Sequence, residues 1–181
     1  QWLRWLRLEK NQGKGAALRA GVLASTGAEV LLCDADLSTP IEEYVRLRPH
    51  LDDADVVLGS RGVPESKITR RQPAYRELMG RLFNVVVRVV AVGGIRDTQC
   101  GFKMFTGAAV EAIFPLVQVE GWAFDIEVLC IARARGLRIV EVPVEWHYRR
   151  DSQVSLLRDG ASMFRELIRI GARARRGAYG R

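Results

Sequence analysis

Short apolar runs alternate with amphipathic stretches along this chain, and this alternation constrains its fold more than any other feature. Runs of strand-forming apolar residues lie at 29–33, 55–60, 102–105 and 138–144. Stretches with the apolar spacing of a helix lie at 13–25, 40–51, 75–92, 107–114 and 124–135. Strands that alternate with helices build a layered sheet in which helices connect successive strands. The sequence therefore predicts an α/β fold with a largely parallel sheet flanked by helices, and a polar loop over 61–73.

Size and charge narrow the class of protein. The 181 residues are 48% hydrophobic and 27% charged, which is typical of one globular domain. The formal net charge of +7 favours anionic partners, such as nucleic acids, phosphorylated small molecules or acidic membrane surfaces. Three well-separated cysteines without a C-x-x-C pair indicate neither a zinc site nor a disulfide framework, so a reducing cytoplasm is the expected location. The longest apolar stretch, Leu82 to Ile95, is interrupted by polar residues and is too short to span a bilayer.

Two carboxylates end the first predicted strand. In the segment L-L-C-D-A-D-L-S-T-P, Asp34 and Asp36 come after the apolar run with one residue between them. Side chains at i and i+2 of an extended segment lie on the same side, so the pair is suited to one hard divalent cation that bridges a diphosphate. The alternative is structural, with Asp36 starting a turn and Asp34 capping the next helix. That helix is predicted to have Thr39 as its N-cap and Pro40 at its first position.

A second motif, N-Q-G-K-G, opens the first predicted helix. Lys14 lies between two glycines, so its ammonium and the nearby backbone amides are candidates for binding a phosphate or pyrophosphate. The motif lacks the upstream glycine and the Ser or Thr after the lysine that a P-loop requires. The structural alternative is a glycine-rich helix start with a solvated lysine.

The C-terminal stretch 156–176 has the pattern of a basic amphipathic helix. Its leucine, methionine, phenylalanine and isoleucine residues fall at helical spacing, and six arginines occupy remaining positions. Such a helix can lie on an anionic bilayer, or it can pack on the core and expose a solvated arginine face. The pattern alone leaves both open.

Six motifs, taken in order, resemble a known family. They are N-Q-G-K-G at Asn11, D-A-D-L-S-T-P at Asp34, G-S-R at Gly59, the pair Arg70-Arg71, D-T-Q-C-G-F-K at Asp97 and W-A-F-D-I-E at Trp122. Together they resemble the family-2 inverting glycosyltransferases that charge polyprenyl phosphates, with the greatest likeness to dolichyl-phosphate β-glucosyltransferases. The resemblance implies a GT-A-like fold, a UDP-sugar donor such as UDP-glucose, a Mg²⁺ or Mn²⁺ ion, and a polyprenyl or dolichyl phosphate acceptor.

The resemblance also implies roles for individual residues. It assigns donor binding to Lys14, Asp34, Asp36, Gln99 and Lys103, and within this set it assigns the metal to Asp34 and Asp36. The acceptor phosphate is assigned to Arg61, Arg70 and Arg71, and the catalytic candidates are Asp36, Arg61, Asp97 and Asp125. Glu127 shares with Asp125 the acidic motif that closes the site in this family, while Trp146 matches a strand position only. Related mannosyl enzymes tend to carry glutamine where this chain has Ser38, so a third metal ligand from that side chain is in doubt.

Structural alternatives stand beside these roles. The three arginines can form a solvated surface cluster, and Asp97 can start the turn before Gly101. Asp125 can cap a helix, and because Asp125 and Glu127 are two residues apart they do not share one helix face. The sequence alone does not decide between these alternatives and the implied roles.

The family resemblance also sets expectations for the extent of the domain. The family places its first strand, with the uridine-binding residues, ahead of the N-x-G-K-G helix, and nothing in the sequence corresponds to it. We therefore expect a catalytic domain over 1–155 that is partial at its N-terminus, and a basic helix over 156–181 that binds an anionic membrane surface at its cytoplasmic face. The alternatives are a mannosyltransferase that uses GDP-mannose and a catalytically inactive, membrane-associated fragment. No nucleic acid partner is expected, because no nucleic-acid-binding motif or aromatic stacking platform is present.

The implied reaction has simple requirements. A lipid monophosphate is already anionic near neutral pH, so it is its own nucleophile and needs no strong general base. Catalysis then depends on orientation and on neutralising charge, which suits a site rich in arginine. A divalent cation held by carboxylates stabilises the departing diphosphate, and one in-line displacement inverts the anomeric carbon.

Overall fold

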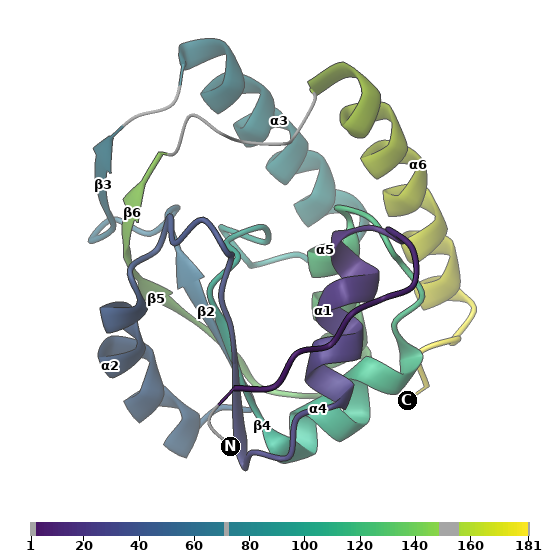
Figure 1. The fold of residues 1–181 in the computed structure, drawn as a ribbon. Helices are drawn as coiled ribbons and strands as arrows, with labels where there is room; N and C mark the ends of the chain where they lie inside the picture. Colours follow the sequence, from purple (N-terminus) through teal and green to yellow (C-terminus); the bar gives the residue numbers. More distant parts are fainter. Residues whose placement is uncertain (1–2, 71–72, 149–155, 181) are drawn as a thin grey trace.

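The computed structural model describes residues 3–70, 73–148 and 156–180. Its helices and strands, in chain order, are α1 (Lys14–Leu23), β1 (Glu29–Leu32), η1 (Ile41–Glu43), α2 (Tyr44–Leu47), η2 (Arg48–Asp52), β2 (Val56–Ser60), β3 (Lys67–Arg70), α3 (Ala74–Val90), β4 (Lys103–Thr106), α4 (Gly107–Ile113), η3 (Phe114–Leu116), α5 (Phe124–Ala134), β5 (Ile139–Pro143), β6 (Glu145–His147) and α6 (Leu156–Arg175). A central sheet lies between α2 on one face and the other helices on the opposite face (Figure 1). The predicted α/β class is confirmed.

The central sheet is mixed in direction. Its strand order is β1-β4-β2-β5, with β2 and β5 parallel and β4 antiparallel to both of its neighbours. Strands β1, β2 and β5 thus share one direction, as predicted, and β4 runs against them. The apolar pattern did not reveal this reversal, because it reports the burial of a strand and not its direction.

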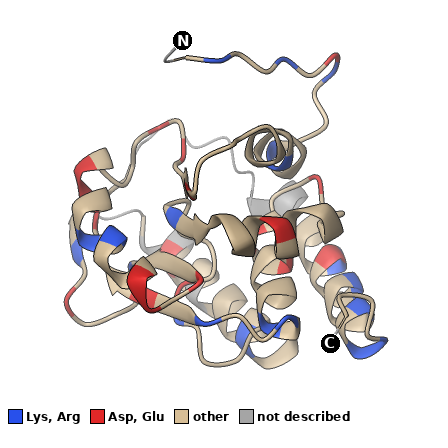
Figure 2. Ribbon diagram, turned by 90° about the horizontal axis from the view of Figure 1, so that it is seen from below, with Lys and Arg blue, Asp and Glu red and all other residues tan. Residues whose placement is uncertain are grey.

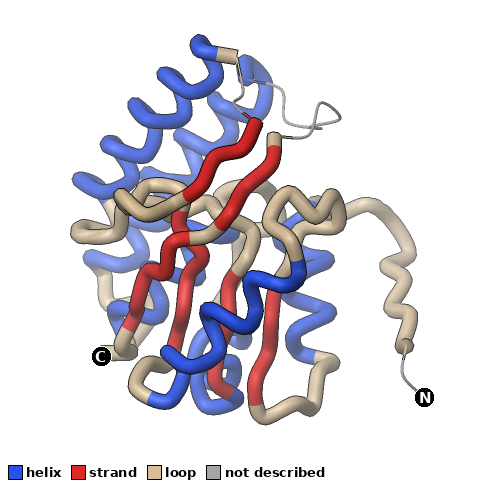
Figure 3. Tube along the Cα trace, turned by 90° about the vertical axis from the view of Figure 1, so that its left-hand side faces the viewer, coloured by secondary structure: helices blue, strands red, loops and turns tan. Residues whose placement is uncertain are grey.

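A second, smaller sheet lies beyond one end of the first. It pairs β3 in parallel with β6, and β6 comes almost directly after β5 (Figure 3). Strand β3 lies within the segment 61–73, so the prediction of a polar loop there is wrong for Lys67–Arg70. The tetrapeptide K-I-T-R carries little strand signal of its own, and its conformation results from pairing with β6.

The central strands separate two hydrophobic cores. Val56, Leu58 and Phe105 pack in the larger core with helices α3 to α6. Val57 and Met104, which alternate with them, pack in the smaller core toward α2. Successive side chains of a strand point to opposite faces, so burial on both faces produces the uninterrupted apolar runs seen in the sequence.

The segment 40–51 differs from the single helix that its spacing predicts. It forms η1, α2 and η2 in succession, with Pro40 and not Thr39 at the N-cap and no side-chain capping bond. Pro49 lies at the start of η2, where a proline cannot donate the backbone hydrogen bond that a continuing α-helix needs. The other predicted helices agree with the observed bounds to within a few residues.

Helix α6 packs on the larger core and keeps part of its apolar surface exposed. Leu167 and Ile170 are buried in that core, and α6 lies beside α3 (Figure 1). On the outer side of the helix Phe164 and Ile168 are about half exposed. Basic residues continue along α6 toward the C-terminus (Figure 2). Within the described ranges, no helix has the length and apolar content needed to cross a bilayer.

Candidate active site

Several chain segments converge at one end of the central sheet. Asp34 comes after β1, Arg61 comes after β2, Lys14 opens α1 and Asp125 lies in the first turn of α5. Because β4 runs against β1 and β2, the loop that enters β4 reaches the same end as the carboxyl ends of those strands. The reversal of β4 therefore brings the motif that begins at Asp97 next to the two aspartates and the G-S-R motif.

Two lysines and two aspartates form a lysine cluster at this end. The Lys14 ammonium lies 2.8 Å from Oδ1 of Asp34 and 3.8 Å from Oδ2 of Asp125. The Lys103 ammonium lies 2.6 Å from the other oxygen of Asp125, and the Lys103 side chain is only 1% exposed. Burial lowers the pKa of Lys14, but the carboxylates of Asp125 and Asp34 outweigh it and raise this pKa above its usual value. The cluster is thus a continuous chain of opposite charges, open to solvent at its Asp34 end.

The structure explains why the motif N-Q-G-K-G has glycine at two positions. A side chain at Gly13 or Gly15 would collide with the backbone of residues 119–120, and Gly13 has a φ of +103°. The amide of Gly13 donates to the Asn11 side chain and the amide of Ala16 donates to the Glu120 carbonyl. These amides are therefore occupied, so the predicted phosphate cradle of backbone amides is wrong for them. The motif instead lets α1 approach closely and places the Lys14 ammonium beside Asp34.

The two aspartates after β1 occupy different environments. The carboxylate of Asp34 lies directly against Gly101, where an added Cβ would be 1.9 Å from Oδ2. Asp36 is exposed, and its Oδ1 accepts a hydrogen bond from the Ser38 amide at 2.9 Å within a turn where Leu37 has a φ of 50°. The predicted turn role of Asp36 is therefore present, and the exposed carboxylate remains accessible to a ligand.

Asp34 and Asp36, which we call the acidic rim, fit a divalent ion only when a bound substrate supplies further oxygen ligands. In the described part of the chain, no group of three or more His, Cys, Asp or Glu residues is placed to hold a metal. Magnesium is commonly held by one or two carboxylates and by substrate phosphate oxygens. Asp34 and Asp36 supply two carboxylates at an open rim, so they match that mode of binding, and Lys14 competes for one of them.

Arg61 and Asp97 form a second, tighter arrangement, which we call the arginine clamp. The Arg61 side chain donates two hydrogen bonds to the Asp97 carboxylate, at 2.7 and 2.9 Å, and the Arg61 amide adds a third at 2.9 Å. The guanidinium also lies over the ring of Trp146, with 5.2 Å to the ring centre. Burial alone would raise the pKa of Asp97, but the charge and hydrogen bonds of Arg61 lower it to about 2. Asp97 is therefore ionised throughout the physiological range, and its Oδ1 also accepts from the Gln99 amide, as a turn-starting aspartate would.

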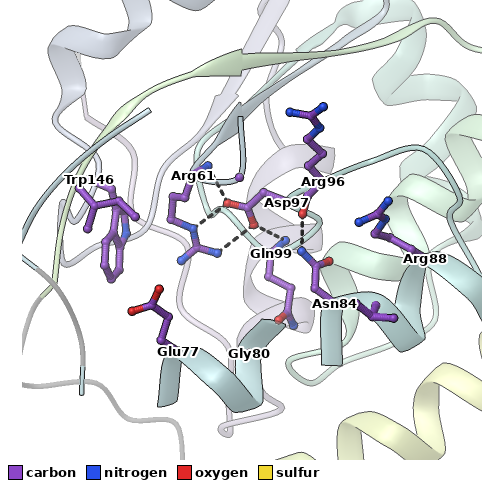
Figure 4. Close-up of a pocket in the computed structure, with 12 residues that line it drawn as sticks. Arg61, Glu77, Gly80, Asn84, Arg88, Arg96, Asp97, Gln99 and Trp146 are labelled. Carbon is purple, nitrogen blue, oxygen red and sulfur yellow. Dashed lines mark hydrogen bonds and ion pairs between the residues drawn. The ribbon is translucent and has the colours of Figure 1, made fainter. Parts of the chain in front are cut away.

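The clamp forms one wall of a pocket of about 570 Å³. Arg61, Asp97 and Gln99 face it from the sheet side, and residues of α3 face it from the opposite side (Figure 4). Those α3 residues include Glu77, Asn84 and Arg88, and Arg96 and Trp146 also line the pocket. Asn84, Arg88 and Arg96 were not predicted as site residues from the sequence. Asn84 and Arg88 interrupt the apolar stretch four residues apart, and this spacing was the available signal.

The remaining predicted site residues lie in three different settings. Arg70 belongs to β3 by its backbone, and Arg71 lies outside the described residues. Lys103 is buried and paired with Asp125, so its predicted contact with a donor would require this pair to open. Asp125 is 4% exposed and makes ion pairs instead of capping α5, whose N-cap Ala123 has no side-chain bond.

Glu127 points away from this site. Its Oε2 accepts from the amides of Gln118 and Val119, both at 2.7 Å, while its Oε1 accepts from Arg173 at 2.8 Å and Tyr179 at 2.9 Å. The side chain is fully buried, and its bonds join α5 to the 118–119 loop, to Arg173 of α6 and to Tyr179 beyond the end of α6. Glu127 is therefore a structural anchor, and the expectation that it closes the site beside Asp125 is wrong, because the two side chains lie on different faces of α5.

Comparisons with known sequences identify the family of the chain. Residues 3–114 match the family model of Glycosyl transferase family 2. The chain is 35% identical over 184 residues to the dolichyl-phosphate beta-glucosyltransferase of Homo sapiens, a match that covers 98% of this chain and 57% of that protein. It is 39% identical over 160 residues to a dolichyl-phosphate beta-glucosyltransferase of Trichomonas vaginalis, covering 85% of this chain and 48% of that protein. The chain thus spans about half the length of the curated relatives it matches.

Solved structures show the same fold. The glucosyl-3-phosphoglycerate synthase of Mycobacterium tuberculosis in complex with Mn²⁺, UDP-glucose and glycerol 3-phosphate superposes with a TM-score of 0.60 at 22% identity. This match covers 90% of the present chain and 55% of that chain. The same enzyme with Mn²⁺, UDP-glucose and phosphoglyceric acid gives a TM-score of 0.59 at 22% identity, with coverage of 90% and 54%. The similarity establishes a shared GT-A-like fold.

Proposed function

The chain belongs to glycosyl transferase family 2, and on this premise we propose that it is the catalytic part of an inverting enzyme that transfers glucose from UDP-glucose to a polyprenyl or dolichyl phosphate. The single observation that carries the proposal is the placement of two chemically distinct regions at one end of the sheet. One is an open acidic rim, and the other is a pocket lined by arginines. The names of the relatives supply the sugar and the lipid acceptor.

The acidic rim is the proposed donor side. Asp34 and Asp36 would hold a Mg²⁺ or Mn²⁺ ion, with Asp36 the more exposed of the two. When bound, such an ion neutralises the charge that develops on the departing diphosphate. Lys14 lies beside Asp34 with its side chain 21% exposed, so it adds a second positive charge where the diphosphate is proposed to bind. Solved neighbours that contain Mn²⁺ and UDP-glucose support this class of ligand on this fold.

The arginine-lined pocket is the proposed acceptor side. Its lining includes three arginines, Arg61, Arg88 and Arg96, the apolar side chains of Ile68 and Val85, and two carboxylates, Glu77 and Asp97, of which Asp97 is paired with Arg61. A polyprenyl phosphate has an anionic head and an apolar chain, so a pocket that combines cationic and apolar lining matches both parts of it. The predicted contributions of Arg70 and Arg71 to the acceptor phosphate remain proposals.

In the proposed reaction the acceptor is the nucleophile. A phosphate oxygen attacks the anomeric carbon of glucose on the face opposite the diphosphate, the bond from that carbon to the diphosphate breaks, and UDP leaves. No proton has to be removed from the nucleophile, so the chain's residues act by orientation and charge. Arg61, fixed by Asp97 and Trp146, would orient the acceptor phosphate, and Gln99 on the pocket wall would contact the sugar.

We also propose that the protein binds peripherally to the cytoplasmic face of an anionic membrane. The neighbouring helices α3 and α6 expose large apolar side chains, and arginines lie beside them. The exposed apolar residues are Tyr75, Leu78, Met79, Leu82, Val85, Val89, Phe164 and Ile168. Apolar area combined with arginines is the surface that binds anionic lipid headgroups and the acyl region below them. Such binding would place the arginine-lined pocket next to the lipid acceptor.

The proposal is tested by transfer of labelled glucose from UDP-glucose to a short polyprenyl phosphate, with Mn²⁺ or Mg²⁺ and with a chelator. Wild-type protein is expected to form a glucosyl lipid only with the metal. The variant Asp36→Asn should lower the rate by about 10²-fold or more while its circular dichroism spectrum stays unchanged. Faster transfer from GDP-mannose than from UDP-glucose would show that the donor is GDP-mannose and not UDP-glucose. Liposome binding without any sugar transfer would instead support a catalytically inactive, membrane-associated protein.

A further inference from the structure

Glu141 on β5 lies behind the arginine clamp and contacts both sides of it. Its Oε1 accepts hydrogen bonds from the Ser60 hydroxyl at 2.8 Å and from the Asp97 amide at 2.9 Å. Its Oε2 accepts from the Arg96 amide at 2.7 Å. None of the six motifs contains this residue.

These three bonds join segments that are distant in the sequence. Ser60 is the last residue of β2 and immediately precedes Arg61, while Arg96 and Asp97 belong to the loop before β4. One carboxylate therefore binds the neighbour of Arg61 and the backbone of Asp97 together. These bonds involve neither the Arg61 nor the Asp97 side chain, and they support the 96–97 loop together with the bond from the Asn84 side chain to the Arg96 carbonyl.

The charge of Glu141 matters for this arrangement. Two successive amides and a hydroxyl all donate to it, so it needs at least three acceptor positions on two oxygens. An ionised carboxylate accepts at both oxygens, whereas a glutamine amide accepts at one and donates at the other. A glutamine at this position would leave at least one of the loop amides without its acceptor.

The clamp in turn fixes the orientation of the Arg61 guanidinium. Its plane is held by two bonds to Asp97 and by the face of the Trp146 ring. Two parallel hydrogen bonds of this kind fix the orientation of the guanidinium and also strengthen its interaction with the carboxylate. A shift of the 96–97 loop would therefore rotate or withdraw the group that faces the pocket.

We propose that Glu141 is a positioning residue for transfer, which sets the acceptor-side geometry by holding Ser60 and the 96–97 loop together. This inference rests on the proposed function, because it assigns the arginine-lined pocket to the acceptor phosphate. It predicts that changes at Glu141 act on the acceptor and leave the binding of the nucleotide at the acidic rim intact. A merely structural role would affect both sides together.

The test compares Glu141→Gln with wild type in steady-state transfer from UDP-glucose to a short polyprenyl phosphate, together with calorimetric titration of UDP in the presence of Mn²⁺. The expected result is a fall of about tenfold or more in kcat/KM for the acceptor, with the UDP dissociation constant unchanged within about twofold. Glu141→Asp retains the charge but is shorter by one methylene, so it is expected to restore little of the activity. The matched control is Glu111→Gln on the exposed surface of α4, which should change neither quantity.

Several outcomes would overturn the inference. Unchanged acceptor kinetics in Glu141→Gln would do so, and so would an equal loss of UDP affinity, since that indicates a general structural role. If Glu141→Gln does not fold, Ser60→Ala removes one of the three bonds, and it should lower acceptor kcat/KM in the same direction by a smaller factor. Failure of the wild type to glucosylate any polyprenyl phosphate would overturn the proposed function itself, and the assignment of Glu141 to the acceptor with it.

Discussion

The two charged regions at the end of the sheet are built differently. In the lysine cluster each lysine meets a carboxylate oxygen through a single ammonium, and the side chain of Asp34 is 36% exposed. In the arginine clamp three donors of Arg61 meet one carboxylate whose side chain is 6% exposed, and an aromatic ring and a further glutamate hold the assembly from behind.

The contrast separates exchangeable contacts from fixed ones. A lysine ammonium is a compact charge that forms and breaks pairs without a fixed geometry, whereas a guanidinium bound at two nitrogens keeps its orientation. The region proposed to receive a metal ion and a diphosphate therefore contains a partly exposed pair, Lys14 with Asp34, that can open, while Lys103 and Asp125 remain buried behind it. The region proposed to orient the acceptor is the one that stays rigid.

The largest expected difference between the regions is in stability. Asp97→Asn removes the carboxylate that binds Arg61 through two of its nitrogens, and we expect a loss of about 3 kcal/mol, the low end of the range for a broken buried pair because the Arg61 side chain is 29% exposed. Asp34→Asn breaks a partly exposed pair and should cost less than about 1 kcal/mol. Urea denaturation measures the loss of unfolding free energy in both variants, and the m-value should be the same as in the wild type. Equal losses in the two variants would remove the contrast.

The dependence of stability on pH should reflect the clamp. The pKa of Asp97 in the folded protein is about 2, below its ordinary 3.8, so its ionised form stabilises the fold fully above about pH 4. This contribution, on the order of 2 kcal/mol, is lost as the pH falls through about 2.

The measurement is the difference in unfolding free energy between wild type and Asp97→Asn from about pH 7 to about pH 2. The difference should be constant down to about pH 4 and shrink below that value. A difference that already declines between about pH 7 and pH 5 would show that another group controls the pair.

The smallest expected effect on stability belongs to Lys14. Lys14→Met should change the unfolding free energy by less than about 1 kcal/mol, because Asp34 is partly solvated and Asp125 keeps its pair with Lys103. Thermal denaturation measures the change, and Arg48→Met, which breaks the surface pairs of Arg48 with Glu29 and Asp52, is the matched control. A loss above about 2 kcal/mol in Lys14→Met would show that the lysine cluster is as rigid as the clamp, and the two regions would then not differ in the way described.

The sequence predicted the elements of the fold well and their directions less well. Apolar runs such as 55–60 and helical spacing such as 124–135 depend on local burial, so they are readable in one chain. The reversal of β4 and the strand β3 depend on pairing with distant segments, and no local pattern reports that.

The site residues that belong to sequence motifs could be predicted from the sequence. Asp34, Asp36, Arg61, Asp97 and Lys14 could be selected from the order of the motifs, and the structure brings Lys14 to Asp34 and Arg61 to Asp97. The contact of Asp34 with Gly101 and the support that Glu141 gives to the clamp join residues far apart in the sequence. The family resemblance placed Glu127 in the site with Asp125, although the spacing of two residues already indicated a different helix face, and the structure confirms the spacing argument.

The most direct test of the contrast is a calorimetric titration of UDP into the wild-type protein and into Asp36→Asn, each with and without Mn²⁺. We predict that wild-type protein binds UDP at least about tenfold more tightly with the metal, and that Asp36→Asn loses this gain while its metal-free affinity stays the same. Equal affinity with and without Mn²⁺ in the wild type, or a full metal effect in Asp36→Asn, would contradict the assignment of the acidic rim to the donor.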